Sequence, residues 1–351
     1  MSRALLAIET SCDDTSAAVM TRAGRLLSSV VHSQNVIHEK YGGVVPEVAS
    51  RAHVERATVV VREALGAAGL GLDDIGQVAV TVGPGLIGAL LVGLHTAKSI
   101  AWARRLPLVP VNHLHGHLAA VWLADPRVPF PMVTLVASGG HTLLVRVQDP
   151  GSFTLLGQTL DDAAGEAFDK GARLLGLGYP GGRELDELAE RGDPAAFAFP
   201  IGLRKPGSLD FSFSGVKTAL FYLLRGMTPE ERVARSADVA ASYRAAIVEA
   251  LTTKLLAAAA VERVAAVGIA GGVAANALLR RRLESEGRAR GLYVVAPPTR
   301  LCTDNAAMIA AAALTGRALP YPEYLSLEAQ ASLPLGAASA AAPGAWGDPP
   351  S

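Results

Sequence analysis

The chain has 351 residues, half of them hydrophobic, so it is long enough for two domains with large buried cores. Its 32 basic and 32 acidic residues balance to zero net charge, whereas a protein that grips nucleic acid unaided is usually basic overall. Two cysteines exclude a disulfide framework and predict a reduced, cytoplasmic protein, and no apolar run predicts a membrane span or a signal peptide.

The N-terminal segment predicts two strands joined by a polar turn. Ala4 to Glu9 and Ser16 to Thr21 are mainly apolar, and residues 10–15 between them read TSCDDT. Cys12 lies within this turn, where it reads as a small buried residue near a site rather than as a nucleophile.

A helix, a strand and a second helix are predicted next. Pro46 to Ala68 carries apolar residues at helical spacing. Gln77 to Val82 predicts a strand, which passes through the glycine-rich turn of residues 83–85 into a helix over Leu86 to Arg104. This order of elements indicates an α/β protein in which helices cover a sheet.

Three histidines then occur within five residues. His113 and His117 are four residues apart, so in a helix both imidazoles point to one face. Imidazole is a common ligand of divalent transition metals, and Leu114 stands where a peptidase of the two-histidine type needs its glutamate. The pattern predicts a metal site without peptidase chemistry, with Asp304 as third ligand. The alternatives are a polar loop and, for Asp304, a cap on the helix predicted from Asn305 to Thr315.

The second half of the chain repeats the order of the first. Met132 to Ala137, the turn of residues 138–140 and His141 to Val147 correspond to the first pair of strands. The strand Ala265 to Ala270, a Gly-Gly turn and a helix over Val273 to Glu286 correspond to the later strand, turn and helix. This repetition predicts two lobes built on one plan.

Glycine-rich turns at equivalent places predict a nucleotide cleft between the lobes. Residues 138–140 (SGG) and Gly271-Gly272 expose backbone N–H groups that bind phosphate oxygens, and glycine lets the ligand come close. We place Asn276 one turn into the following helix, within reach of a ribose or a base edge. The alternative is that the glycine pairs only punctuate turns.

Helical insertions separate the repeated parts. Glu166 to Leu175 and Glu184 to Arg191 predict short helices, and Pro229 to Ala259 predicts one or two longer ones. Residues 336–351 are rich in Ala, Gly and Pro and predict a disordered tail.

Carboxylates in these insertions are candidates for contacts with ribose hydroxyl groups. Asp169 lies in the first short helix, and Asp186 follows Gly182 at the start of the second. The alternative is that Asp169 and Lys170 form an exposed helix surface.

Taken together, these segments resemble one family along nearly the whole chain, from about Ala4 to Thr315. It is the TsaD family, the bacterial tRNA threonylcarbamoyladenosine transferases, long described as O-sialoglycoprotein endopeptidases. The matching segments are residues 8–15, 41–47, 83–86, His113 with His117, 138–142, 169–170, 179–182, 210–215, 271–276 and 302–305.

The resemblance implies a fold and a reaction. The fold would be the duplicated actin/Hsp70/sugar-kinase type, with an N-terminal lobe over residues 1–128 and a C-terminal lobe over 129–335, which carries a helical insertion at about 165–260. The reaction would transfer a threonylcarbamoyl group from threonylcarbamoyl-AMP to the N6 amine of the adenosine 3′ of the anticodon, in tRNAs that read codons beginning with A.

The resemblance also implies the site residues. His113, His117 and Asp304 match the family's ligands for one divalent metal, iron with zinc as the alternative. The positions that hold the adenylate match Val136, Ala137, Ser138, Gly139, Gly140, Asp169, Gly182, Asp186 and Asn276. Bacterial relatives work in the cytoplasm on tRNA, with a paralogous TsaB-type subunit and a TsaE-type ATPase, and without a membrane.

The chain departs from the family's pattern at a few positions. Asn112 and His115 stand where His and Glu are frequent, and Asp14 replaces a frequent Glu. His115 is therefore an alternative metal ligand. Archaeal and eukaryotic relatives place a tyrosine near the metal, where this chain has Val136.

Other classes of function remain as alternatives. An ATP-dependent kinase of the same superfamily would use the same cleft, but usually has Asp where this chain has Glu9, and lacks the histidine pair. A metallopeptidase and a non-catalytic scaffold of the TsaB type are further alternatives, which Leu114 and the retained metal ligands respectively oppose.

Overall fold

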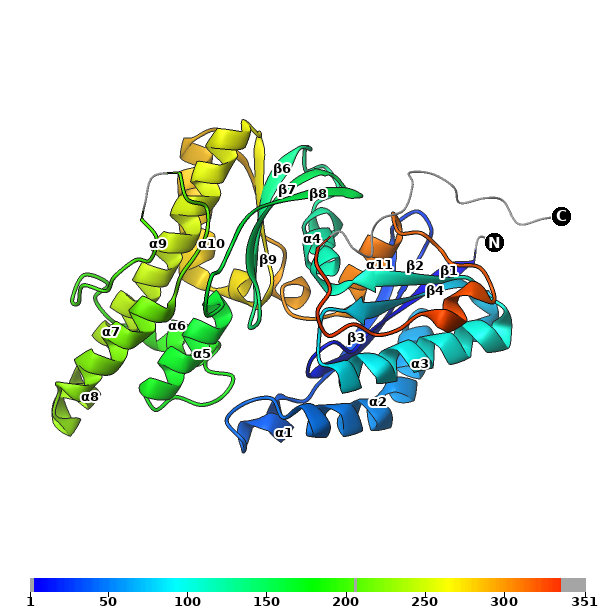
Figure 1. The fold of residues 1–351 in the computed structure, drawn as a ribbon, viewed down its shortest axis with the longest axis horizontal. Coiled ribbons are helices and arrows are strands. Elements are labelled where there is room, and N and C mark those ends of the chain that lie inside the picture. The colour runs from blue at the N-terminus through cyan, green and yellow to red at the C-terminus, as the bar shows by residue number, and fades with distance from the viewer. Residues whose placement is uncertain (1–2, 205–206, 336–351) are drawn as a thin grey trace.

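The computed structural model describes residues 3–204 and 207–335, which form two α/β lobes side by side (Figure 1). The predicted tail lies outside the described residues. Each lobe is built on one five-stranded sheet, and the first has the order β3-β2-β1-β4-β5. Its first three strands are antiparallel, and the last two run parallel to β1. Their bounds are β1 Ala4–Glu9, β2 Asp14–Met20, β3 Leu26–Ser33, β4 Ile75–Gly83 and β5 Leu108–Asn112.

The second sheet repeats this plan in the order β10-β9-β6-β7-β8. In chain order, the first three strands (β6, β7 and β8) run antiparallel, each to the next, and the last two (β9 and β10) run parallel to β6. Their bounds are β6 Met132–Ala137, β7 Thr142–Asp149, β8 Ser152–Gln158, β9 Ala266–Ala270 and β10 Tyr293–Val295. The predicted duplication is therefore confirmed.

Helices cover both faces of the first sheet. Residues of β1 alternate between them: Leu6 and Ile8 pack against α2 and α3, while Leu5 and Ala7 pack against α11. Pro46 begins α2 because proline is favoured at the first helical position. The helices of this lobe are α1 Asn35–Glu39, α2 Pro46–Ala67, α3 Ile87–Arg104 and α11 Ala306–Ala313.

Helix α4, His113–Ala124, lies between the two sheets (Figure 1). Leu118 and Val121 pack on strands of the second sheet, and Ala119 and Ala120 belong to the core of the first lobe. Its first nine residues are all buried. A polar side chain on this helix therefore needs a partner inside the protein.

The remaining helices cover the second sheet on the side away from the first lobe (Figure 1). Val133 and Leu135 of β6 lie in the same core as the long helix α9. The helices are α5 Ala164–Leu174, α6 Gly182–Ala189, α7 Ser214–Arg225, α8 Pro229–Ala234, α9 Ser236–Glu262 and α10 Ala277–Ala289. Short 3-10 turns occur along the whole chain: η1 Leu72–Asp74, η2 Gly272–Ala275, η3 Thr299–Leu301 and η4 Glu323–Ser326. In the described residues, no helix is long and apolar enough to cross a membrane.

After β10 the chain returns to the first sheet. Helix α11 packs against α4 and the first sheet, Leu319 pairs with Leu108 of β5, and the N–H of Gln330 donates to the carbonyl of Val82. The expected C-terminal lobe extends to residue 335. The segment after β10 packs instead on the first lobe, because the apolar residues of α11 are buried there. That return brings residue 304 to the start of α4.

Candidate functional site

The histidine segment is helical from its first histidine. The side chain of Asn112 accepts a hydrogen bond from the N–H of Leu114 at 2.9 Å, which caps α4. His113 and His117 therefore lie one turn apart on one face, and their ring centroids are 4.6 Å apart. The interpretation of this segment as a loop is wrong.

Asp304 completes a group of three. Its Oδ1 lies 3.5 Å from Nε2 of His113 and 3.3 Å from Nε2 of His117. One ligand atom of each residue lies within 4.8 Å of the others, so the group can hold a metal ion. Asp304 does not cap α11: the side chain of Asn305 accepts the N–H of Met308 at 3.0 Å. The alternative role for Asp304 is therefore wrong.

The chemistry of the group fits a divalent transition metal. His117 is fully buried, and neither of its ring nitrogens has a hydrogen-bond partner. A buried polar atom without a partner is rare and indicates a place where a ligand or an ion binds. Two imidazoles and one carboxylate are a donor set that suits iron and zinc alike.

The charges of the group are strongly coupled. Burial alone lowers the pKa of His113, but the carboxylates of Asp304 and Glu9 outweigh it and raise that pKa to about 9. Burial alone raises the pKa of Asp304, but the nearby charges of His113 and His117 lower it well below its usual range. The carboxylate of Asp304 is thus ionised, as a metal ligand must be.

His115 points away from this group. Its Nε2–H donates to the carbonyl of Pro150 at 3.0 Å, and its ring packs edge-on against Phe153 at 4.5 Å. Burial lowers its pKa to about 4, so the ring is neutral at pH 7. His115 fastens α4 to the hairpin of the second sheet, and the interpretation of His115 as an alternative metal ligand is wrong.

The turn after β1 brings further carboxylates near the group. Burial, followed by the charges of Asp304 and Asp13, raises the pKa of Asp14 to about 7. Burial also raises the pKa of Cys12, with the nearby carboxylates adding to the effect. A thiol whose pKa is raised is a poor nucleophile, which agrees with the prediction that Cys12 is not a covalent carrier.

The turn of residues 138–140 follows β6 and reaches the histidine group. The N–H of Ser138 donates to the carbonyl of His141 at 2.8 Å, which closes the turn. A Cβ added at Gly139 or at Gly140 would meet no atom within 4 Å, so their backbone faces open space. Burial and the positive charges of His113 and His117 lower the pKa of His141 to about 4. His141, the residue that follows the glycine turn, therefore lies within electrostatic range of the two histidines.

Neighbouring elements pack tightly around this turn. A Cβ at Gly165 of α5 would lie 2.5 Å from the carbonyl oxygen of Ser138. Gly271 has a φ of +86°, and a Cβ there would lie 2.3 Å from the carbonyl oxygen of Ala137. Glycine is needed at both places because the backbones touch. The two predicted glycine turns thus lie together at the ends of β6 and β9.

Asn276 lies elsewhere on its helix than the sequence predicted. It precedes α10, separated from the strand by η2, and its Oδ1 accepts the N–H of Leu279 at 2.9 Å. Its Nδ2 donates to Asp186 at 2.8 Å. The placement one turn into the helix is wrong, because the chain first forms a 3-10 turn. Asn276 caps α10 and holds Asp186.

Asp186 is shared between several donors. It also accepts from the N–H of Ala277 at 2.9 Å and from the buried guanidinium of Arg244 at 2.6 Å. Asp169 accepts the N–H groups of Gly181 and Gly182, each at 3.1 Å. These carboxylates shape the loops beside the glycine turns.

Val136 and Ala137 are buried within β6, between β7 and β9. Their side chains face the protein core, so any contact with a bound nucleotide has to come from the backbone where the strand ends.

Sequence reasoning missed Glu9 as a member of the site. It ends an otherwise apolar buried strand and is itself fully buried, and its Oε2 lies 3.2 Å from Nδ1 of His113. A charged residue at the end of a buried strand is a signal that the sequence does contain. Arg173 of α5 was also missed; it donates from the second lobe to the carbonyl of Gly42 in the first lobe.

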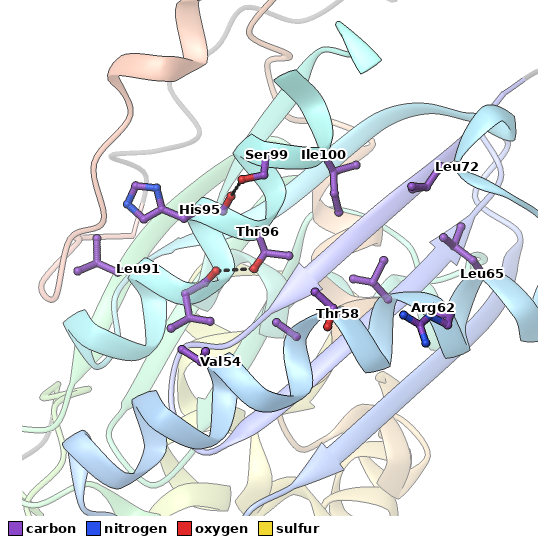
Figure 2. A pocket seen from close by; sticks show the side chains of 13 residues that line it. Val54, Thr58, Arg62, Leu65, Leu72, Leu91, His95, Thr96, Ser99 and Ile100 are labelled. Carbon is purple, nitrogen blue, oxygen red and sulfur yellow. Dashed lines mark hydrogen bonds between the residues drawn. The ribbon is translucent and has the colours of Figure 1, made fainter. Parts of the chain in front are cut away.

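A separate apolar groove lies on the outer surface of the first lobe, between α2 and α3 (Figure 2). Its volume is about 740 Å³, and Val54 is 65% exposed at its edge. None of the candidate site residues lines it. The residues are Val54, Ala57, Thr58, Val61, Arg62, Leu65, Leu72, Leu91, Val92, His95, Thr96, Ser99 and Ile100.

Comparison with solved structures confirms the fold. Component A of (R)-2-hydroxyglutaryl-CoA dehydratase from Acidaminococcus fermentans is 16% identical, covers 93% of this chain and 100% of its own, and has a TM-score of 0.52. Full-length HypF is 13% identical, with 89% of this chain and 46% of its own covered and a TM-score of 0.58. These likenesses show the predicted duplicated actin/Hsp70/sugar-kinase fold and nothing of the reaction.

Comparison of sequences gives the family. A family model described as tRNA N6-adenosine threonylcarbamoyltransferase matches residues 25–311. Proteins of that name from Moorella thermoacetica and Geobacter metallireducens are each 51% identical, over 94% of this chain and 97% of their own length. These relatives support acyl transfer over the kinase alternative, and the chain belongs to the TsaD family of tRNA N6-adenosine threonylcarbamoyltransferases.

Proposed function

We propose that this transferase moves the threonylcarbamoyl group of threonylcarbamoyl-AMP to the N6 amine of the adenosine 3′ of the anticodon, in tRNAs that read codons beginning with A. The observation that carries the proposal is the juxtaposition of His113, His117 and Asp304 with the open glycine turn of residues 138–140. One group suits a metal and the other suits a phosphate, so together they suit a donor in which an acyl group is joined to a phosphate as a mixed anhydride.

His113, His117 and Asp304 are the proposed metal ligands, and iron is the proposed metal, with zinc as the alternative. Bound there, the metal supplies Lewis-acid polarisation to the threonylcarbamoyl-phosphate end of the donor. The unpartnered ring nitrogens of His117 support this assignment.

The chain's own residues hold the adenylate. We assign the phosphate to the backbone N–H groups of Gly139 and Gly140, in the turn that Ser138 closes, and the nucleoside to the loops that Asp169 and Asn276 shape. Gly182, Asp186 and the backbone at Val136 and Ala137 complete the proposed adenylate site.

No covalent carrier is needed on the enzyme. The donor's carbonyl carbon is already activated as a mixed phosphoric anhydride, so the tRNA amine attacks it directly, AMP leaves, and the amine loses a proton. Positioning and charge stabilisation are then the enzyme's main contributions. The raised pKa of Cys12 supports this, since a thiolate is not favoured there.

Transfer of label tests the proposal. The purified chain is combined with its TsaB-type and TsaE-type counterparts, the adenylate-forming enzyme, labelled threonine, bicarbonate, ATP and a tRNA that reads an A-starting codon. Label in the tRNA that depends on this chain, and is lost with Asp304→Ala, is expected. A competent mixture in which Asp304→Ala labels tRNA as well as the wild type contradicts the metal assignment.

We further propose a paralogous TsaB-type subunit and a TsaE-type ATPase as partners, and a cytoplasmic location. The groove between α2 and α3 is the candidate surface for the paralogue, because exposed apolar grooves of this kind usually mark an interaction surface (Figure 2). Leu91→Glu should abolish that complex, and Val233→Glu, an exposed position on α8, should not. If both variants bind the paralogous subunit equally well, that subunit binds at a surface other than this groove.

The boundary between the lobes is also a proposal. We end the first lobe at residue 128 and begin the second lobe at residue 129, with the helical insertion at about 165–260 in the second lobe. The segment from Leu301 to Leu333 joins the first lobe, as its contacts with the cores there support.

A further inference from the structure

A fully buried carboxylate holds the nitrogen of His113 that does not face Asp304. Glu9 is the last residue of β1, and none of its surface is exposed. It receives three hydrogen bonds: from the N–H of Ser11 at 2.5 Å, the hydroxyl of Thr81 at 2.6 Å and Nδ1 of His113 at 3.2 Å. A buried charge is tolerated only when it is satisfied in this way.

These bonds fix the tautomer of His113. An ionised carboxylate only accepts, so the neutral imidazole carries its proton on Nδ1. The hydroxyl of Ser11 lies 3.0 Å from the same nitrogen and accepts from it as well. In the neutral form that binds a metal, the lone pair of His113 is therefore on Nε2, which lies 3.5 Å from Asp304. That is the orientation a metal ligand needs.

The second histidine has no such support. His117 is fully buried, and its Nε2 faces Oδ1 of Asp304 at 3.3 Å, but neither of its ring nitrogens has a hydrogen-bond partner in the described residues. The two ligands therefore differ: protein contacts set the ring of His113, whereas only the metal would set the ring of His117. Most metal-bound histidines donate their second N–H to a carboxylate, a carbonyl or water.

We propose that Glu9 is the positioning residue of the metal site. Its carboxylate holds His113 in the Nδ1–H tautomer and so points Nε2 of His113 at the metal. Thr81 in turn holds the carboxylate of Glu9. This inference rests on the proposed function, since it takes His113, His117 and Asp304 as the ligands. Glu9 is not a ligand itself, because its oxygens are engaged by three donors.

The length of the side chain is part of the proposal. Glu9 lies on β1 and His113 on the neighbouring helix α4, so the carboxylate has to span the distance between two elements. Aspartate at this position would keep the charge but lose one methylene of reach. A purely electrostatic role would tolerate aspartate, whereas a positioning role would not.

Metal affinity tests the proposal without the transfer reaction. The full chain is freed of metal, and its dissociation constants for Zn²⁺ and Co²⁺ are measured by competition with a chelator. Glu9→Gln and Glu9→Asp should each weaken binding about 10- to 100-fold, the usual effect of losing such a partner. The visible absorption of bound Co²⁺ should also change, because it reports ligand orientation.

Matched variants separate positioning from folding. Glu284→Gln, an exposed glutamate on α10, should leave both dissociation constants unchanged. Thr81→Val removes one bond to Glu9 but no charge, and should weaken binding by less than Glu9→Gln does; it keeps the test decisive if Glu9→Gln does not fold. Thermal unfolding of each metal-free variant shows which ones are folded.

Each outcome has one meaning. If the wild type binds no metal, the proposed metal site fails. If the wild type binds metal and a folded Glu9→Gln binds it equally well with the same Co²⁺ spectrum, only the role of Glu9 fails. If Glu9→Gln does not fold, unchanged binding by Thr81→Val overturns the role of Glu9. If Glu9→Asp matches the wild type while Glu9→Gln does not, charge and not position is what Glu9 supplies, and the proposal is overturned.

Discussion

Asn305 caps helix α11 with its side chain, which leaves the carboxylate of its neighbour Asp304 to face the two histidines of α4. The two residues thus have separate tasks: one begins the helix, and the other projects from the residue before the cap. Helix α11 packs against α4, so the cap fixes the distance between Asp304 and the histidines.

This division of tasks predicts opposite effects for two adjacent substitutions. Asn305→Ala should lower the free energy of unfolding by about 1 kcal/mol, as the loss of a cap usually does. Asp304→Asn should remove metal binding, because asparagine supplies no carboxylate ligand, while the cap of α11 remains. Chemical denaturation and metal titration measure the two effects, and a loss of metal only in Asn305→Ala would contradict this assignment.

The three histidines of α4 should behave differently on substitution. His113→Ala combined with His117→Ala should remove bound metal and most transfer while the fold remains. His115→Gln should keep both, because glutamine retains a donor for the carbonyl of Pro150. The metal content of each variant is measured after anaerobic loading with iron. Normal metal content in the double variant would contradict the assignment of His113 and His117 as ligands.

Much of the fold was predictable because its pattern is local. The duplication and the buried strands β1, β4, β6 and β9 follow from apolar runs and glycine turns in the sequence. The outer strands β3, β5, β8 and β10 were missed: β3 and β8 are half exposed, and β5 and β10 have only five and three residues. An apolar pattern is weakest at the edge of a sheet.

The candidate site was predictable only in part. The spacing of His113 and His117 gives a shared helix face, but no local pattern says which of Asp304 and Asn305 caps the next helix. The predicted place of Asn276 was wrong for the same reason, since the roles of Asp304 and of Asn276 both depend on where a helix begins. The partner of Glu9 could not be assigned, because its bond to His113 joins residues 104 positions apart.

His115 should make the protein sensitive to mild acid. Its pKa is about 4 in the folded protein and about 6.5 in an unfolded chain, so between these values the unfolded state binds more protons. Stability is therefore full above pH 6.5 and falls as the pH drops toward 4. From pH 7 to pH 5 this group alone should cost about 2 kcal/mol.

The acid effect is measured by chemical denaturation of the wild type and His115→Gln at pH 7 and pH 5. The variant should lose less stability over this interval. Part of the loss should remain, because the pKa of His141 is lowered to about 4 as well. Equal losses in the two proteins would show that the ring of His115 is not buried in its neutral form.

Asn276 should affect both stability and donor binding. Asn276→Ala removes the cap of α10 and the bond to Asp186, so it should cost about 1 kcal/mol of stability and weaken binding of the adenylate by about 1–3 kcal/mol. Asn276→Ser keeps a capping oxygen and should restore only the stability. Calorimetry with AMP measures the affinity, and unchanged affinity in both variants returns Asn276 to a purely structural role.

Arg173 should hold the two lobes together across the cleft. Its guanidinium, on α5 of the second lobe, donates to the carbonyl of Gly42 in the loop that follows α1 of the first lobe. Loss of this bond in Arg173→Ala should free residues 40–45 and weaken the contact between the lobes by about 1 kcal/mol, or about fivefold in the KM for the donor, with kcat changed less.

Hydrogen exchange gives the second readout for Arg173. Amides of residues 40–45 should exchange faster in Arg173→Ala, whereas Arg183→Ala, an exposed arginine on α6 that pairs with Glu187 of its own helix, should leave them unchanged. Faster exchange in both variants would point to a general loss of stability. A bond that fixes a loop must slow the opening of that loop. Unchanged exchange in Arg173→Ala would therefore show that other contacts hold residues 40–45.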